Sequence, residues 1–244
     1  MQASQCSAGK HLGERVVSIG TGSSTSAYTT GAVVCRAEDL GFHLRSTALA
    51  TPKAVVAIHL CTDIELNRHW LGLERAALLA RTLAQTREPL RLRSFNAQWT
   101  SMGATGASAL IDVLRNAPKL ARLDLSGNWI GDAGSAALVR LLRKSRTLRV
   151  LRLRWNGFTE EAIGPIRIAL RTTRGGKVLE ELDLGGNWLK NAGATRLAHA
   201  FYKNPFPSRN PYPKLRVLRL DMNGIQSAGL TAIVQALNWT NVWP

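Results

Sequence analysis

The stretch that decides the fold is LARLDLSGN, which runs from Leu120 to Asn128. Leucine stands at its first, fourth and sixth positions and asparagine at its ninth. The same pattern returns as LRVLRLRWN at 148–156, LEELDLGGN at 179–187 and LRVLRLDMN at 215–223. A self-similar period of about 20 to 50 residues indicates a repeat architecture, in which one small unit is stacked several times.

An earlier, degenerate copy begins at Leu92, continues with Phe95 and Ala97, and has Thr100 in the asparagine position. The first anchors fall at 92, 120, 148, 179 and 215, so the spacings are 28, 28, 31 and 36 residues. The two longer spacings contain insertions at 172–177 and 204–214, which we interpret as loops.

Each copy continues into an alanine-rich segment with helical periodicity, so one unit is expected to be strand, turn and helix. The leucines of the strand point into the core. The asparagine side chain can both donate to and accept from backbone groups of adjacent turns, which requires it to be buried. The expected structural asparagine ladder consists of Asn128, Asn156, Asn187 and Asn223.

These residues resemble the leucine-rich repeat family, in the long-repeat subtype typified by ribonuclease inhibitor. The resemblance covers about 150 residues of the chain. It implies an α/β fold, a right-handed leucine-rich-repeat solenoid in the shape of a horseshoe arc. A parallel sheet would line the concave side and helices the convex side. It also implies that the chain binds other molecules through its exposed strand positions.

The first repeat has two possible registers. One register uses Cys61, Ile64, Leu66 and His69. The other uses Val55, Ile58, Leu60 and Asp63. With either register, residues 54–244 form a leucine-rich-repeat domain of about six units. Residues 1–53 are expected to be a Ser/Thr/Gly-rich N-terminal arm, because such a composition buries little apolar surface, and they weakly resemble an organellar transit peptide.

Composition indicates a globular chain with an anionic partner. Among 244 residues, 32 Lys and Arg stand against 16 Asp and Glu, a formal charge of +16, and 45% are apolar. Residues 90–178 alone hold 16 Lys and Arg against five acids. An excess of this size attracts an acidic protein or RNA phosphates. No apolar stretch approaches the roughly 18 residues that a membrane span needs.

The three cysteines are Cys6, Cys35 and Cys61, and none forms a CxxC pair. We therefore expect neither a disulfide framework nor a zinc site. This predicts an intracellular protein, either cytosolic or organellar, whose thiols stay reduced. The histidines lie in no HExxH or GxSxG motif, and no glycine cluster forms a phosphate-binding loop. The sequence thus predicts no enzyme activity, no cofactor, no metal and no small-molecule substrate.

The predicted concave surface is read from the strand positions that lie between the leucines and before the asparagine. Its members are Trp99, Arg122, Arg152, Arg154, Trp155, Asp183, Arg219 and Met222. Tryptophan and arginine most often carry interface energy. Two alternatives stay open: the charges in the column from Asp124 to Arg219 can pair with one another, and each tryptophan ring can lie flat on a neighbouring glycine.

A basic patch is predicted on the convex helices. Its members are Arg140, Arg143, Lys144, Arg167, Arg171 and Arg174. Spacings of three and four residues place the first three on one helix face and the last three on another. The alternative is that both faces are merely solvated.

The sequence therefore predicts a non-catalytic protein-interaction or scaffolding subunit of a larger assembly, which binds an acidic partner. The alternative is a basic ribonucleoprotein subunit, of the ribosomal type, that contacts RNA phosphates.

Overall fold

The computed structural model describes residues 33–37, 58, 60–86, 89–201 and 214–238. Within them, short strands alternate with helices along the chain. The strands are β1 (Val34–Arg36), β2 (Asp63–Glu65), β3 (Ser94–Asn96), β4 (Arg122–Asp124), β5 (Val150–Arg152), β6 (Glu181–Asp183) and β7 (Val217–Arg219). The helices are α2 (Gly72–Ala84), α3 (Gly103–Leu114), α4 (Ser135–Lys144), α5 (Glu160–Thr172), α6 (Arg174–Val178), α7 (Lys190–Ala198) and α8 (Ser227–Asn238), with a 3-10 turn, η1 (Asp132–Gly134).

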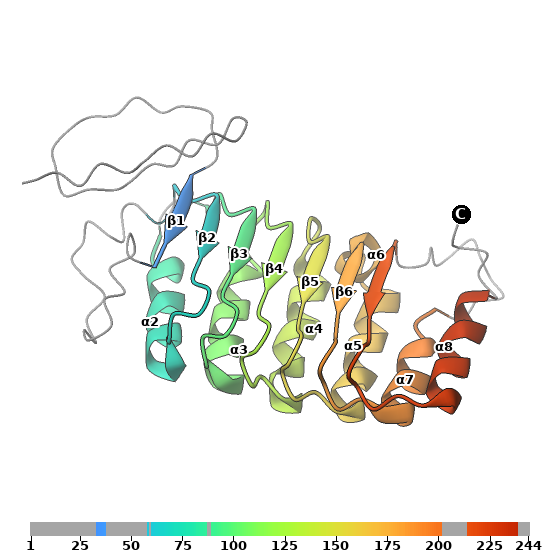
Figure 1. The fold of residues 1–244 in the computed structure, drawn as a ribbon. Coiled ribbons are helices and arrows are strands. Elements are labelled where there is room, and N and C mark those ends of the chain that lie inside the picture. Colours follow the sequence, from blue (N-terminus) through green and yellow to red (C-terminus); the bar gives the residue numbers. More distant parts are fainter. Residues whose placement is uncertain (1–32, 38–57, 59, 87–88, 202–213, 239–244) are drawn as a thin grey trace, which may run out of the picture.

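The strands form one parallel sheet in chain order, from β1 to β7. Every strand pairs with the next at the same register, so Leu123 lies beside Leu151 and Leu151 beside Leu182. Figure 1 shows the strands side by side as one layer and the helices as a second layer behind them. The predicted α/β solenoid is confirmed. A parallel sheet of this kind needs a crossover in each unit, and from β2 to β7 the helices supply it.

The core lies between these two layers. Leu123 and Leu125 are fully buried, as the leucine pattern requires. Leu138 and Leu141 of α4 are also fully buried, stand one helical turn apart and belong to the same core. We call each unit of strand, turn and helix a rung. Because every rung places apolar residues at the same positions, the core continues from one rung to the next, and each rung is stabilised mainly by its neighbours.

The predicted asparagines are all buried, with side chains that join successive rungs. The Nδ2 group of Asn128 donates to the carbonyl oxygens of Ala97 (2.7 Å) and Leu125 (2.9 Å). Its Oδ1 accepts from the backbone N–H of Thr100 at 3.1 Å and from the Thr100 hydroxyl at 2.8 Å. The Thr100 hydroxyl has one hydrogen, which can alternatively be donated to the carbonyl oxygen of Ala97 at 3.1 Å, so a hydroxyl replaces part of the amide's bonding in the degenerate copy.

The structure decides the register of the first predicted repeat. Cys61, Ile64 and Leu66 are fully buried, and Ile64 is the central residue of β2. This is the first of the two registers. One further rung precedes it, because β1 pairs with β2 through Cys35 and Ile64. Among the described residues the sheet therefore has seven strands, and its first strand lies inside the segment assigned to the N-terminal arm. Within residues 1–53 the structure describes 33–37.

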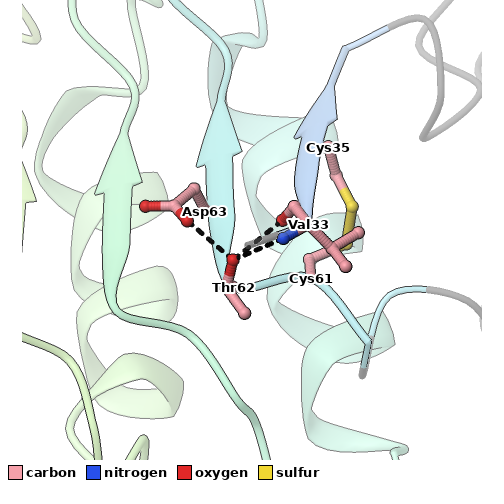
Figure 2. The surroundings of a disulfide bond; sticks show 5 residues. All are labelled: Val33, Cys35, Cys61, Thr62 and Asp63. Atoms are coloured by element: carbon pink, nitrogen blue, oxygen red, sulfur yellow. Dashed lines mark hydrogen bonds between the residues drawn. A yellow bond between two sulfur atoms is a disulfide. The ribbon is translucent and has the colours of Figure 1, made fainter. Parts of the chain in front are cut away.

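The expectation that the cysteines stay reduced is wrong for two of them. Cys35 and Cys61 form a disulfide with a Cα–Cα distance of 5.8 Å (Figure 2). They are 26 residues apart in the chain, close to one repeat, and stacking the rungs brings them together. A hydrogen bond also joins the start of β1 to this part of the chain, since the Thr62 hydroxyl accepts from the backbone N–H of Val33 at 2.8 Å. Disulfides persist in oxidising compartments, so the cysteines no longer support the predicted reducing compartment. Cys6 lies outside the described residues.

The insertion at 172–177 also differs from the expected loop. Residues 174–178 form the short helix α6, which packs beside α4 and α5. A Cβ atom on Gly175 would collide with the carbonyl oxygen of Leu142. Only glycine permits this close approach of α6 to the end of α4. The insertion at 204–214 falls almost entirely outside the described residues.

Candidate interaction surfaces

The charged side chains on the concave face pair with one another from β4 to β7. Arg152 lies 2.8 Å from Glu181 and 3.8 Å from Asp124, and Arg219 lies 3.5 Å from Glu181. Each pair joins neighbouring strands. The pairs are at least partly exposed, so each contributes about 0 to 1 kcal/mol. The geometry matches the alternative in which the charges of this column pair with one another. We call this set of ion pairs the charge ladder.

Arg154 extends the ladder toward the end of the strands. It forms an ion pair with Asp221 and lies 3.8 Å from Asp183. The hydrogen bond from Arg154 holds the pKa of Asp221 below its usual value. Burial instead raises the pKa of Asp124, despite its hydrogen bond from the backbone N–H of Ser126 at 3.1 Å. Arg122 is exposed, and it has no ion pair among the described residues.

The predicted tryptophans lie on glycines of the neighbouring rung. A Cβ atom on Gly127 would collide with the ring of Trp99, and a Cβ atom on Gly186 with the ring of Trp155. Both glycines have positive φ, at 72° and 65°. The geometry therefore matches the second alternative, in which each ring lies flat on a glycine. The opposite ring faces still reach solvent, because Trp99 and Trp155 are 48% and 41% exposed.

Met222 occupies the same position on the last rung. Its side chain is 68% exposed, and the sulfur lies 3.8 Å from Nη2 of Arg154.

The predicted basic patch is divided by the structure. Arg140 of α4 makes two bonds of 2.8 Å to the carboxylate of Asp112 on α3, which hold the pKa of Asp112 below its usual value. Its charge is therefore neutralised locally. Arg143 and Lys144 are exposed in the last turn of α4. Lys144 donates to the Asn116 side chain at 2.5 Å.

The second predicted face is interrupted. Arg167 and Arg171 lie on α5, whereas Arg174 begins the separate helix α6. Thr173 between them has an extended backbone, so the three arginines do not share one helix face. Arg171 bonds to the carbonyl oxygen of His199 at 3.4 Å.

A more continuous basic surface runs along the edge where each helix leads into the next strand. We call this surface the basic edge. It carries ten Lys and Arg among the described residues: Arg91, Arg93, Arg115, Lys119, Arg146, Arg149, Arg174, Lys177, Lys214 and Arg216. The described acid in these segments is Glu180, which pairs with Arg149. Sequence reasoning missed this edge because it grouped cations by helix face instead of by position in the repeat.

The opposite edge, where each strand leads into the next helix, has a different chemistry. We call it the aromatic edge, because it holds every described tryptophan: Trp70, Trp99, Trp129, Trp155 and Trp188. Its described charges are two arginines, Arg68 and Arg154, and two aspartates, Asp132 and Asp221. The sequence analysis did not select Trp70, Trp129 and Trp188. Their shared place directly after the asparagine position was the available signal.

The part of the chain that the structure describes contains no helix long and apolar enough to cross a membrane. The same part contains no group of three His, Cys, Asp or Glu side chains that could hold a metal ion.

Comparisons with known proteins agree with this architecture. The sequence model described as leucine-rich repeat matches residues 116–139, 144–166, 177–198 and 213–234. These four segments are leucine-rich repeats, and the fold carries the same unit N-terminal to them, in β2 with α2 and β3 with α3. No curated protein sequence matches the chain.

Two solved structures illustrate the likeness. The tropomodulin C-terminal domain from Caenorhabditis elegans is 16% identical over 69% of this chain and 93% of its own length, with a TM-score of 0.48. An internalin from Listeria monocytogenes is 14% identical over 76% of this chain, with a TM-score of 0.42. The chain spans about half of that internalin, 49% of its length.

Proposed function

We propose that this leucine-rich-repeat chain is a non-catalytic interaction or scaffolding subunit that binds an acidic partner protein along its basic edge. One observation carries the proposal: ten cations stand against one acid in the described segments of that edge. An unbalanced surface of this kind raises a positive potential that attracts and orients an anionic partner. Leucine-rich repeats generally mediate protein interaction. A subtype like that of ribonuclease inhibitor fits the long repeats and their full helices.

The other cationic surfaces are less suited to this role. On the concave face, Arg152, Arg154 and Arg219 already pair with carboxylates. On the convex face, Arg140 is held by Asp112. A partner would have to displace these pairs before it could bind. By contrast, exposed cations of the basic edge such as Arg93, Lys119 and Arg146 have no ion pair among the described residues.

The arrangement favours a protein over single-stranded RNA. Proteins that hold single strands combine a cationic groove with aromatic rings on which the bases stack. In this molecule the ten cations of the basic edge and the exposed tryptophans occupy opposite edges of the sheet, so one RNA strand could not use both sets. An acidic polypeptide needs only the cations.

Charge reversal tests the proposal. The edge variant carries Arg93→Glu, Lys119→Glu and Arg146→Glu. The matched control carries Arg68→Glu, Arg81→Glu and Lys190→Glu, which change the net charge equally at exposed positions away from the edge. The probes are a labelled polyglutamate of about 20 residues and a polyuridylate of the same length, each titrated at several salt concentrations.

We expect the edge variant to bind polyglutamate at least tenfold more weakly than the wild type, while the control variant stays within about threefold. Equal losses in both variants would mean that only net charge matters and would overturn the edge as a site. A wild type that binds polyuridylate but not polyglutamate would favour the ribonucleoprotein alternative. In that case the salt dependence should lose about 0.7 units of slope for each cation removed.

A further inference from the structure

The outer row of the aromatic edge consists of Trp70, Trp129 and Trp188, and these side chains are unusually exposed. Their exposed fractions are 64%, 67% and 58%. None of the three indole N–H groups has a hydrogen-bond partner within the described residues. Burying rings of this size is a large source of binding energy, and tryptophan is enriched in the most energetic part of interfaces. The row is therefore a candidate binding surface.

The row has a regular spacing. Its tryptophans occupy alternate rungs, and the intervening rungs carry Ser101 and Gly157 at the same position. Neighbouring strands lie about 4.8 Å apart. Backbone hydrogen bonds also join the turns of adjacent rungs, such as Gly131 N–H to the carbonyl oxygen of Asn156 at 2.8 Å, so the backbones of successive tryptophans are about 9.6 Å apart. The Trp188 ring extends toward the small residue on the preceding rung, because a Cβ atom on Gly157 would lie 3.8 Å from it.

The charges around the row favour an uncharged ligand. The aromatic edge carries two arginines and two aspartates among its described residues, in a protein of formal charge +16. Arg154 and Asp221 of this edge neutralise each other. Trp70 already has a cation near its ring, since the guanidinium of Arg75 lies 5.9 Å from the ring centroid. A polyanion would be drawn to the basic edge instead.

We infer that the outer row binds an uncharged, proline-rich segment of a partner protein in the polyproline II conformation. This helix has three residues per turn and rises about 3.1 Å per residue, so it repeats about every 9.3 Å. That pitch nearly equals the spacing of the tryptophan rungs. A proline on each turn would lie against an indole, and each indole N–H would donate to an exposed backbone carbonyl. Aromatic surfaces recognise this preformed helix at a low entropic cost.

The inference uses a different edge from the proposed function and does not depend on it. It also predicts a length requirement. The outer row spans five rungs from Trp70 to Trp188, and the four steps between them add up to about 19 Å. A ten-residue oligoproline is about 31 Å long and covers all three tryptophans, whereas a four-residue oligoproline of about 12 Å reaches two at most.

Fluorescence anisotropy of labelled deca- and tetraproline with the full chain tests the inference. The row variant carries Trp70→Ala, Trp129→Ala and Trp188→Ala. The control carries Ile168→Ala, Leu230→Ala and Val234→Ala, which remove three exposed apolar side chains from the convex helices. Circular dichroism checks that both variants keep the fold. A hexamer of N-acetylglucosamine serves as an alternative probe, and sedimentation reports self-association.

We expect the wild type and the control to bind decaproline at least tenfold more tightly than tetraproline, and the row variant to lose at least tenfold in decaproline affinity. Absent decaproline binding, or equal binding by the row variant, would overturn the inference. So would binding of the sugar hexamer alone, which would assign the row to a glycan. A dimer of the wild type that dissociates in the row variant would assign the row to a second copy of this chain.

Discussion

The side-chain oxygen of Asn156 accepts a hydrogen bond from the backbone N–H of Asn128, 28 residues earlier in the chain, at 3.1 Å. The same oxygen accepts from Ile130 N–H at 3.3 Å, and Nδ2 of Asn156 donates to Leu125 at 3.0 Å. One fully buried amide thereby satisfies backbone groups of the preceding rung. These direct hydrogen bonds join its own rung to the preceding one.

Replacing this amide should destabilise the fold. Asn156→Ala leaves two buried N–H groups and a carbonyl without these partners, so we expect a loss of about 1 to 3 kcal/mol in the free energy of unfolding. Urea denaturation measures the loss. Asn67→Ala is the control, because Asn67 is exposed. An unchanged midpoint in Asn156→Ala would contradict the structural role of the asparagine ladder.

The contact between Trp155 and Gly186 predicts a coupled pair of variants. Gly186→Ala places a methyl group against the ring and forces a side chain onto a residue with φ of 65°, so it should destabilise the protein by about 1 to 3 kcal/mol. In the Trp155→Ala background the clash disappears and the backbone strain remains. The cost of Gly186→Ala should therefore be smaller there. Additive effects in thermal or urea unfolding would show that the ring does not rest on the glycine.

The disulfide predicts local stability at the first rung. Each rung of a solenoid contacts mainly its neighbours, so Cys35→Ser should loosen β1 while the central repeats stay folded. Closing a loop of 26 residues is worth about 3 kcal/mol, which corresponds to about 100-fold faster amide exchange in β1. Hydrogen exchange followed by mass spectrometry measures this rate. Cys6→Ser is the control. Unchanged protection of β1 in Cys35→Ser would contradict the prediction.

Asp124 and Asp221, which both belong to the charge ladder, should affect the pH dependence of the stability in opposite directions. Burial raises the folded pKa of Asp124, so its ionised form costs stability at neutral pH, and the cost vanishes as the pH falls through that pKa. Asp124→Asn should therefore stabilise the protein at pH 7, with a gain that shrinks in acid. Asparagine can still accept from Ser126 N–H, and Arg152 keeps Glu181.

Asp221 provides the contrast, because its folded pKa is lowered by Arg154. Its contribution is present at neutral pH and is lost as the pH falls through the folded pKa. Asp221→Asn should therefore cost a small amount of stability at pH 7 and nothing in acid. Urea denaturation of both variants from pH 3 to 7 checks the two signs. The same sign in both would contradict the assigned environments.

The repeat could be predicted from the sequence because each leucine or asparagine position has the same structural role in every unit. Leu123 and Leu151 occupy one such position and Asn156 another, and the regular spacing alone reveals them. The partners of Arg140 and Arg152 could not be predicted, since Asp112 and Glu181 are 28 and 29 residues away and are brought near by stacking. Cys35 and Cys61 were missed for a similar reason. The first strand lacks the leucine signature, so nothing marked β1 as a rung.

The separation of the two edges gives the molecule a preferred direction of approach. Ten of its cations lie along one side of the sheet, and the other side is locally neutral. In the long-range field of an anionic body the chain would turn before contact, as a dipole does, and would arrive with the basic edge leading. The tryptophans would then face away from that body into open solvent. Two different partners could thus be held at the same time, one on each side, with the thickness of the solenoid between them.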